Sequence, residues 1–432
     1  MTKRLLGPIM LLVVLLIAVV IDAGRNSAVS EVVLEESASV PTTISGAAGT
    51  AATVESVAPS TTVTESTTTT EFTTTTTAPS AREVAEEVAR SIIEKMTAEE
   101  RLSQLFIVEV EPENAAQALS ADSWGGLFLK MEDFSPAETT SIVGAAQTAA
   151  AESSSVGAFI SSDVEGGRIT KMPVDPIDLP GLLAELPNEA ILTEYRDLAD
   201  ELCVLGVNLN LAPVGDVDEF SNPVLANGRS FSTDPSAVAN YVSIVLDAYA
   251  SAGLSSAPVA TTTKHFPGHG AASLDSHNSG AAVGPREELE GTHVLPFKSA
   301  IEQYQTQPGA IMIGHLTVGD ETEPATFSHE VVTEWLRNDL GHDGVVISDD
   351  LANMAAVTDR PEAERARLAL IAGIDILLWN DLAKATQAKN ALSEEISLNP
   401  DGDVARAASA SLLRILTLKV ELGLASDGRP TC

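Results

Sequence analysis

Basic residues are scarce in this sequence. Its 432 residues include 25 lysines and arginines against 61 aspartates and glutamates, which gives a net charge of −36 at pH 7. Nucleic acids and anionic lipid surfaces both require a basic face on the protein that binds them. We therefore expect no nucleic-acid partner and no docking on anionic lipid, and we attribute the acidity to a soluble, exposed surface.

Cysteine is also scarce, with Cys203 and Cys432 as the only two. An exported chain could join them, but Cys203 lies in a helical, partly apolar pattern typical of a core position, and Cys432 is the last residue. We expect no disulfide. Two cofactor motifs are absent as well: no GxGxxG follows a predicted strand, and no HExxH occurs. The sequence therefore has no motif for a nucleotide cofactor and no HExxH motif for a metal, and we expect neither group.

The N-terminus begins with Lys3 and Arg4, followed by an almost unbroken apolar run from Leu5 to Ile21. This arrangement is typical of an export signal, although about seventeen apolar residues is long for a cleaved signal and short for a bilayer span. We interpret residues 1–26 as a signal peptide or a membrane anchor, and cleavage after Ala23 and retention both remain open. No cysteine follows the run, so we expect no lipid anchor.

The next segment, residues 27–80, is rich in threonine and serine and poor in large apolar residues. Such a segment cannot bury enough surface to fold, so we predict a disordered Thr/Ser-rich linker. A folded domain is expected over 81–426, with a tail at 427–432. The folded part is then exported, either extracellular or associated with the cell envelope, and we expect it to be a monomer.

Eight short apolar runs follow at regular intervals, each typical of a buried strand. The eight runs are Leu105–Val108, Gly126–Leu129, Val156–Ser161, Val207–Leu211, Val259–Thr263, Ala310–Ile313, Val345–Ile347 and Ile374–Trp379.

Helical patterns precede these runs and separate most of them. A first helix is predicted from Ala81, a second begins at the capping pair Thr97 and Glu100, and amphipathic stretches of helical length separate the strands. These stretches cover 188–205, 235–252, 287–304 and 328–340. Alternating strands and helices are typical of an α/β fold, and the count of eight favours a single parallel (β/α)8 TIM-type barrel over a doubly wound open sheet.

Polar residues follow most of the predicted strands. In a barrel, the carboxyl ends of the strands meet at the face where active sites lie. The residues at these ends are Asp163, Glu165 and Arg168 after the third strand, Asp216 and Asp218 after the fourth, Lys264 and His265 after the fifth, His315 after the sixth, Asp349 and Asp350 after the seventh, and Asn380 after the eighth. So many polar ends at one mouth indicate a functional site.

Some of these residues also have a structural interpretation. A strand-end aspartate can cap the next helix, and this applies to Asp350 and Asp218. Asp349 directly continues its strand, so it should point into the mouth if Asp350 caps. Arg229, in the loop after the fourth strand, could pair with a surface acid, but a guanidinium there is also suited to hold ligand oxygens.

The stretch from Lys264 to His277 concentrates chemistry-bearing side chains. It holds three of the seven histidines of the chain, and its glycines and proline indicate a sharp turn after the strand. Asp275 and His277 should share a loop, where the carboxylate can accept from one imidazole nitrogen and leave the other free. A catalytic site, a structural loop and a metal site all remain open on this pattern alone.

Together, the motifs EGGR (165–168), GRSF (228–231), KHFPGHG (264–270), DSH (275–277) and ISDDL (347–351) resemble glycoside hydrolase family 3. The similarity covers about Met96–Gly423 and is greatest to the NagZ-like β-N-acetylglucosaminidases. It implies that Asp349 is the nucleophile and that His277, oriented by Asp275, is the general acid and then the general base. It also implies that Asp163, Arg229, Lys264 and His265 hold the sugar.

Two departures from the family pattern occur. Lys171 stands where the family often has arginine, so a bidentate contact to substrate becomes a point charge. The residues Asn278–Ala282 replace a leucine-proline pair that commonly follows DSH.

The resemblance implies a retaining exo-β-N-acetylglucosaminidase (a β-N-acetylhexosaminidase) that removes GlcNAc from peptidoglycan fragments or other glycans. A β-glucosidase or a GlcNAc phosphorylase of the same family is an alternative, and so is a non-catalytic, surface-displayed glycan-binding protein.

Overall fold

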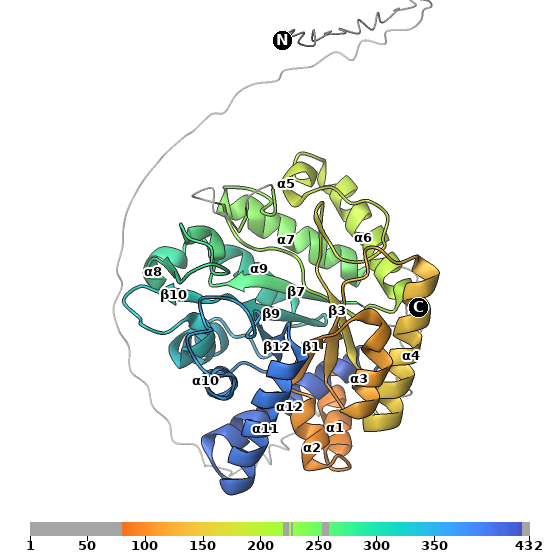
Figure 1. Ribbon diagram of the computed structural model, residues 1–432. Helices are drawn as coiled ribbons and strands as arrows, with labels where there is room; N and C mark the ends of the chain where they lie inside the picture. Colours follow the sequence, from red (N-terminus) through yellow and green to blue (C-terminus); the bar gives the residue numbers. More distant parts are fainter. Residues whose placement is uncertain (1–79, 219–223, 226–227, 253–258, 426–432) are drawn as a thin grey trace, which may run out of the picture. The chain divides into compact units, whose positions relative to one another are not determined.

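The computed structural model describes residues 80–218, 224–225, 228–252 and 259–425. These residues form a barrel of parallel strands with helices around it (Figure 1). The barrel strands are β1 (Phe106–Glu109), β2 (Gly126–Phe128), β3 (Phe159–Ser162), β6 (Leu209–Asn210), β7 (Ala260–Phe266), β9 (Gly309–Ile313), β11 (Val345–Ser348) and β12 (Leu377–Trp379). Each of the eight predicted strands is present, so the predicted α/β barrel is confirmed.

The strands pair in the order β11-β9-β7-β6-β3-β2-β1-β12. A further parallel bridge between Ile347 on β11 and Ile376, just before β12, brings the two ends of the sheet together. The sheet is therefore a nearly closed barrel. In this order β3 and β11 lie four strands apart, on opposite sides of the mouth.

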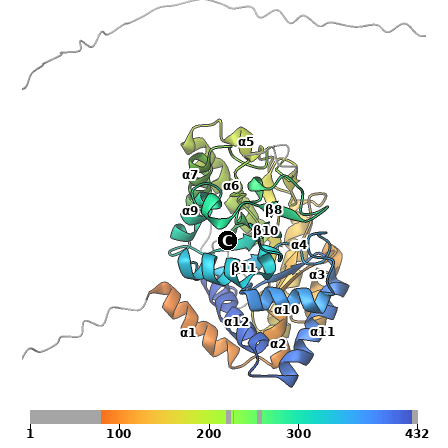
Figure 2. The same ribbon diagram turned by 90° about the vertical axis from the view of Figure 1, so that its left-hand side faces the viewer.

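An outer layer of helices surrounds the barrel (Figures 1 and 2), and all but the first two of the described helices, which precede β1, come after a strand in the chain. Its longer members are α1 (Ala81–Ile93), α4 (Pro136–Ser154), α6 (Asn188–Leu205), α7 (Pro235–Ala250), α9 (Leu295–Gln303), the π-helix η4 (Glu330–Asp339), α10 (Glu362–Ala372), α11 (Leu382–Leu398) and α12 (Asp403–Glu421). The shorter ones are α2 (Ala98–Ser103), η1 (Pro112–Asn114), α3 (Ala115–Ala121), α5 (Pro180–Leu183), η2 (His269–Ala271), α8 (Arg286–Leu289) and η3 (Ala325–Phe327).

Two capping boxes begin the helical part of the chain. Ser80 and Glu83 cap α1, and Thr97 and Glu100 cap α2, the second of which was predicted. In each box the hydroxyl accepts from a backbone N–H and the glutamate accepts from the cap residue, so two donors without a helical partner are satisfied. Helices α1 and α12 pack against each other, as Figure 2 shows.

The core lies both inside the barrel and between the barrel and its helices. The strands are buried on both faces, as continuous apolar runs in a parallel sheet require. Phe106, Phe159 and Trp379 are fully buried on β1, β3 and β12. The strands are therefore fixed by packing, which allows the residues at their carboxyl ends to hold precise positions.

Two small sheets extend the mouth. Strands β4 (Val164–Gly166) and β5 (Ile169–Thr170) form an antiparallel pair just after β3. Strands β8 (Ala281–Val283) and β10 (Leu316–Val318) form a parallel pair from the segments after β7 and β9. Both sheets lie outside the barrel order and belong to its loops.

Three predictions need correction. The fifth strand runs on to Phe266, because Phe266 still pairs with Ile313 of β9, so Lys264 and His265 lie within the strand instead of beyond its end. The predicted helix over 287–304 is two helices, α8 and α9, and Pro296 lies in the first turn of the second. The third correction concerns a cysteine.

Cys203 is disulfide-bonded, which contradicts the expectation that it is unpaired. Its side chain is buried on α6, as predicted. A buried position does not distinguish the two states, because a half-cystine and a thiol occupy core positions equally well. The other cysteine, Cys432, lies outside the described residues.

The predicted signal or anchor and all of the predicted linker except Ser80 lie outside the described residues, as does the tail at 427–432. Among the described helices, none combines the length and the apolar character that a membrane span requires.

Candidate active site

A pocket of about 130 Å³ opens at the carboxyl ends of the barrel strands. Its polar lining residues come from β7, from the positions directly after β3, β11 and β12, and from the loops that follow β6 and β7. They are Asp163, Arg229, Lys264, His265, His277, Asp349, Asp350 and Asn380. The apolar lining residues are Phe128, Leu211, Met312, Met354 and Leu378. Residues up to 252 positions apart in sequence thus meet at one mouth, because parallel strands end at the same face.

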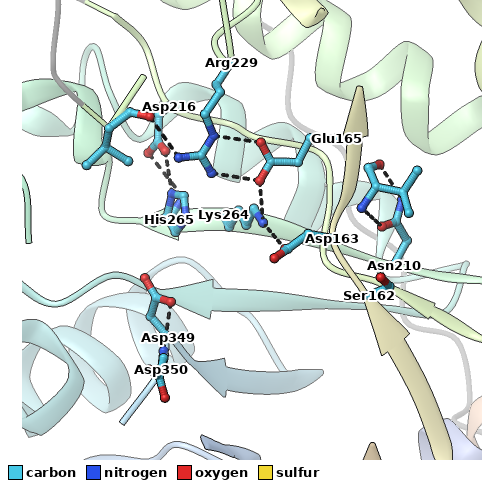
Figure 3. A network of polar contacts seen from close by, with 12 residues as sticks. Ser162, Asp163, Glu165, Asn210, Asp216, Arg229, Lys264, His265, Asp349 and Asp350 are labelled. Carbon is cyan, nitrogen blue, oxygen red and sulfur yellow. Dashed lines mark hydrogen bonds and ion pairs between the residues drawn. The ribbon is translucent and has the colours of Figure 1, made fainter. Parts of the chain in front are cut away.

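One side of the pocket is a buried cluster of charges, shown in Figure 3. Nζ of Lys264 lies 2.7 Å from Oδ1 of Asp163 and 2.6 Å from Oε1 of Glu165. Arg229 donates two bonds of 2.8 Å to the two oxygens of Glu165 and a third of 2.9 Å to the carbonyl of Val224. Glu165 therefore joins the two cations and fixes their positions in the wall.

The charges in this cluster stabilise one another. Burial alone would raise the pKa of Glu165, but the adjacent Lys264 and Arg229 lower it far below its ordinary value. Burial alone would lower the pKa of Lys264, but Asp163 and Glu165 raise it. Glu165, Lys264 and Arg229 are therefore charged at neutral pH. Asp163 is 28% exposed, so part of its carboxylate faces the pocket.

His265 is fixed by a second buried carboxylate. Asp216 is fully buried, and its Oδ2 lies 2.7 Å from Nδ1 of His265, while its Oδ1 accepts from the backbone N–H groups of His265 and His269. Burial opposes the charge on Asp216, but the neighbouring histidines and N–H groups lower its pKa. With Nδ1 held by Asp216, Nε2 is the imidazole nitrogen of His265 that is available to the pocket.

The two aspartates after β11 have different surroundings. Asp350 accepts from the backbone N–H groups of Ala352, Asn353 and Asn380. It therefore caps the turn after the strand and does not cap the next helix, which its structural interpretation had suggested, because α10 begins only at Glu362. Asp349 accepts from the N–H of Asp350 and lines the pocket. The prediction that Asp349 points into the mouth is confirmed.

Asp349 is held as a carboxylate. Burial alone would raise its pKa, but His265, His315 and His277 lower the pKa of Asp349 to about 2. Histidines therefore surround this carboxylate from β7, from the segment after β9 and from the loop after β7. An ionised carboxylate in a partly apolar pocket is suited to nucleophilic attack or to stabilisation of a developing cation.

Asp275 and His277 form the predicted dyad. Oδ1 of Asp275 lies 2.8 Å from Nδ1 of His277 and accepts from its backbone N–H at 2.9 Å, while Asn278 donates to Oδ2. The His277 side chain is 55% exposed and lines the pocket with Asp349. Its Nε2 is therefore free to exchange a proton with a group bound above Asp349.

The loop that carries the dyad is attached at two places. Ser276 is fully buried, and its Oγ lies 2.8 Å from Nε2 of the buried His269. The carbonyls of Ser276 and His277 accept from the N–H groups of Ala356 and Ala355, in the segment after β11. The exposed imidazole of His277 is thus carried by a backbone that is bonded on both sides.

The structure brings most of the predicted site residues together. Asp163, Arg229, Lys264, His265, His277 and Asp349 line one pocket, and Asp275 supports His277 from behind. Lys171 does not line it. Its backbone N–H donates to the carbonyl of Asp163, but its ammonium pairs with Glu132 at 2.7 Å, at the rim.

Three supporting residues were not predicted to have a role, namely Glu165, Asp216 and Ser276. Glu165 and Asp216 were noted as strand-end acids. Their expected position at the same mouth as Lys264 and His265 was the available signal. Ser276 gave no signal in the sequence, because its burial depends on the position of the loop. Within the described residues, no cluster of three or more acidic, histidine or cysteine side chains is placed to hold a metal ion.

Comparisons with known proteins agree with the family resemblance of the sequence motifs. The family model "Glycosyl hydrolase family 3 N terminal domain" matches residues 97–417. The β-hexosaminidase LpqI of Mycobacterium tuberculosis is 32% identical over 361 residues, which cover 79% of this chain and 89% of the relative. β-Hexosaminidase A of Pseudoalteromonas piscicida is 30% identical over 347 residues, which cover 72% of this chain and 56% of the relative.

Solved structures show the same likeness. A glycoside hydrolase family 3 β-N-acetylglucosaminidase from a Paenibacillus species has a TM-score of 0.69 and 29% identity, over 76% of this chain and 63% of that one. The M. tuberculosis LpqI structure has a TM-score of 0.66 and 29% identity, over 77% of this chain and 96% of that one. This chain therefore spans nearly all of LpqI but less than two thirds of the Paenibacillus and Pseudoalteromonas proteins.

Proposed function

Because the chain belongs to glycosyl hydrolase family 3, we propose that it is a retaining exo-β-N-acetylglucosaminidase. The observation that carries this proposal is one pocket that holds both the ionised carboxylate of Asp349 and the Asp275–His277 dyad. The substrate class rests on the relatives, which at 30% identity or more are named β-hexosaminidases. A glucosidase and a non-catalytic glycan-binding protein are both less well supported.

In the first half-reaction, Asp349 attacks the anomeric carbon of a terminal β-linked GlcNAc. A bond forms between a carboxylate oxygen and C1 while the glycosidic C1–O bond breaks, and the departing oxygen takes a proton from Nε2 of His277. Asp275 accepts from Nδ1 and stabilises the orientation of the ring. The product of this step is a covalent glycosyl-enzyme.

In the second half-reaction, His277 is neutral and acts as a base. It takes a proton from water, the water oxygen bonds to C1, and the bond to Asp349 breaks. The two inversions at C1 retain the β configuration. One imidazole can serve both steps because histidine exchanges its proton near neutral pH.

The charged wall would hold the sugar. Asp163 would accept from ring hydroxyls, and Lys264, Arg229 and Nε2 of His265 would donate to hydroxyl and carbonyl oxygens. Because Glu165 and Asp216 already fix these donors, little ordering would be needed when the sugar binds. A substrate-binding role for Lys171 stays a prediction, and its ion pair at the rim would have to open for direct contact.

The proposed setting is the cell envelope, where peptidoglycan fragments or other glycans carry β-linked GlcNAc. This part rests on the N-terminal sequence pattern, with either a cleaved signal or a membrane anchor. The proposal includes a monomeric protein.

The test is release of p-nitrophenol from its β-GlcNAc glycoside by the purified protein and by Asp349→Asn. We expect the wild type to be active and Asp349→Asn to lose about 10⁴-fold or more in kcat/KM, as loss of a nucleophile does. Asp403 forms an exposed ion pair with Arg406, and Asp403→Asn serves as the matched control. Binding of GlcNAc without turnover would support the glycan-binding alternative, and preference for the β-glucoside would support the glucosidase.

Phosphorolysis is separated from hydrolysis by the product. The reaction is repeated with inorganic phosphate, and the sugar product is analysed as GlcNAc or GlcNAc 1-phosphate. Formation of free GlcNAc at an unchanged rate in the presence of phosphate is the expected result. Accumulation of the sugar phosphate would show that phosphate, and not water, accepts the sugar in the second half-reaction.

A further inference from the structure

A second, larger cavity adjoins the catalytic pocket. This groove has a volume of about 550 Å³ and lies at the carboxyl ends of β1 and β12, against α3 and the start of α11. Its lining residues are Glu109, Val110, Glu111, Asn114, Gln117, Ala118, Ala121, Asn380 and Leu382. Asn380 lines both cavities, so the groove lies directly beside the catalytic pocket.

The position of the reacting groups indicates where the aglycone leaves the pocket. Asp163 follows β3 and Asp349 follows β11, and these strands are on opposite sides of the barrel. A sugar whose hydroxyls contact Asp163 and whose anomeric carbon faces Asp349 therefore lies across the mouth. The group bonded to that carbon leaves from the face opposite Asp349, within reach of His277, and extends away from the charged wall.

One flank of β11 is already filled. The dyad loop is hydrogen-bonded to Ala355 and Ala356 after β11, and the paired strands β8 and β10 come from the segments after β7 and β9. The other neighbour of β11 around the barrel is β12, and beyond it β1. The groove lies on this open flank, so it offers the aglycone an adjacent surface.

The lining of the groove combines the two kinds of contact that sugars make. Leu382 is 37% exposed and, with Val110, gives an apolar surface for the C–H face of a ring. The side-chain amides of Asn114 and Gln117 can exchange hydrogen bonds with hydroxyls. Neither amide has a side-chain hydrogen bond among the described residues.

The charges that line the groove have one sign. The ionisable lining residues are Glu109 and Glu111. Glu109 receives both of its bonds, each 2.9 Å, from Lys130, whereas the Glu111 side chain has no ion pair among the described residues. A carboxylate on the aglycone would therefore meet a carboxylate of the groove without a free cation to pair with.

We propose that this groove is the aglycone subsite and that it favours a neutral sugar, such as a second GlcNAc, over a sugar that bears a carboxylate. The proposal rests on the proposed glycosidase function. It adds a location for the leaving group and a substrate class, namely neutral β-linked N-acetylglucosamine oligosaccharides in preference to GlcNAc linked to an acidic sugar.

A steric test fills the groove. Ala121→Trp places an indole in it, and Ser120→Trp, on the same helix but outside the lining, is the matched control. We expect Ala121→Trp to raise KM for the disaccharide GlcNAc-β-1,4-GlcNAc about tenfold. The p-nitrophenyl glycoside, whose aglycone is too short to extend along the groove, should change by less than about twofold in both variants.

A charge test measures selectivity. Glu111→Lys reverses the unpaired charge in the groove, and Glu113→Lys makes the same change in η1 outside the lining. The readout is the ratio of kcat/KM for GlcNAc-β-1,4-GlcNAc to that for GlcNAc-β-1,4-N-acetylmuramic acid, which bears a carboxylate. We expect Glu111→Lys to lower this ratio about fivefold and Glu113→Lys to leave it within about twofold.

The outcomes separate this inference from the proposed function. A wild type that cleaves none of the three substrates would overturn the glycosidase itself. An active enzyme in which Ala121→Trp affects disaccharide and aryl glycoside alike, or neither, would overturn the subsite. An unchanged selectivity ratio in Glu111→Lys, together with an Ala121→Trp variant that is impaired on the disaccharide but not on the aryl glycoside, would overturn the charge preference and leave the location standing.

Discussion

The two sides of the catalytic pocket are built in opposite ways. On the sugar-binding side, the Lys264 and Glu165 side chains are 4% and 1% exposed, and each has at least two charged partners. On the acid–base side, His277 is 55% exposed and depends on a loop. The first side belongs to the barrel interior, and the second lies on its surface.

Because of this difference, we expect substitutions that affect the stability of the fold and substitutions that affect proton transfer to lie on different sides of the pocket. Removing one partner from a buried ion cluster leaves an uncompensated charge in a medium of low polarity. Removing an exposed side chain leaves only a gap that water fills. Substitutions on the sugar-binding side should therefore alter folding and binding together, whereas substitutions on the acid–base side should alter the chemistry alone.

The largest effect is expected for Glu165→Gln. This change leaves Lys264 and Arg229 buried without their shared carboxylate, which should lower the free energy of unfolding by about 3 kcal/mol or more and raise KM for every substrate. Denaturant unfolding and steady-state kinetics measure the two effects.

Glu132→Gln is the matched control for that change, because Glu132 is paired with Lys171 at the rim and is 36% exposed. An exposed pair contributes less than about 1 kcal/mol. Equal destabilisation by the two substitutions would show that the charged wall is no more critical than a surface ion pair.

A large effect on activity without loss of stability is expected for His277→Ala. Cleavage of GlcNAc-β-1,4-GlcNAc should fall about 10²- to 10⁴-fold, because its leaving group needs a proton. The 2,4-dinitrophenyl glycoside, which needs none, should form the glycosyl-enzyme within about tenfold of the wild-type rate. Its turnover would then be limited by the second half-reaction and should increase when azide is added.

The exposed His329 provides the control for this variant, since it lies on the surface outside the pocket. His329→Ala should leave both substrates unaffected, and both histidine variants should change stability by less than about 0.5 kcal/mol. A His277→Ala variant that loses the two substrates equally would argue against an acid–base role.

The same contrast explains what could be predicted from the sequence. The barrel strands could be found because each is a run of apolar residues, and the positions of Asp163, Lys264 and Asp349 followed from strand ends that meet at one mouth. The pairing of Asp275 with His277 was predictable because the two are neighbours in the chain. Local sequence pattern and barrel topology together were sufficient for these residues.

Other features depend on how distant segments pack. Glu165 could be identified as a strand-end acid, but its bonds to both Lys264 and Arg229 depend on where the loop after β6 lies. The burial of Ser276 and the disulfide of Cys203 likewise depend on segments that sequence pattern does not place together. Pairings of this kind are set by tertiary contacts, which periodicity does not report.

A smaller effect is expected for Ser276→Ala, which removes the bond between the dyad loop and His269. Burial lowers the pKa of His269, so this imidazole is neutral near pH 7 and can exchange a hydrogen bond with the serine hydroxyl. Loss of that bond should make the position of His277 less precise. We expect kcat for GlcNAc-β-1,4-GlcNAc to fall about tenfold and kcat/KM for the 2,4-dinitrophenyl glycoside to stay within about threefold.

Ser273→Ala is the matched control, because Ser273 is exposed on the same loop. It should leave both substrates unchanged. If Ser276→Ala slows the two substrates equally, the bond supports folding of the site in general and has no specific role in placing the acid.

The smallest change is expected when the pH is varied with the 2,4-dinitrophenyl glycoside, whose first step depends on the sugar-binding side and on Asp349. The pKa of Asp349 is lowered to about 2, and those of Glu165 and Asp216 are also below their ordinary values. These carboxylates are therefore ionised throughout the range from about pH 4 to about pH 8. The value of kcat/KM for this substrate should stay within about twofold over that range.

The stability of the fold sets the lowest pH at which this rate can be measured. A carboxyl group whose pKa is lowered on folding contributes stability that is fully present above its unfolded pKa, near 4, and is lost as the pH falls toward the folded pKa. Unfolding should therefore accompany any loss of rate below about pH 4, and circular dichroism at each pH would detect it. If the enzyme stays folded but loses activity on the 2,4-dinitrophenyl glycoside between pH 4 and 6, Asp349 binds a proton in that range. The buried side of the site would then be as sensitive to pH as its surface loop.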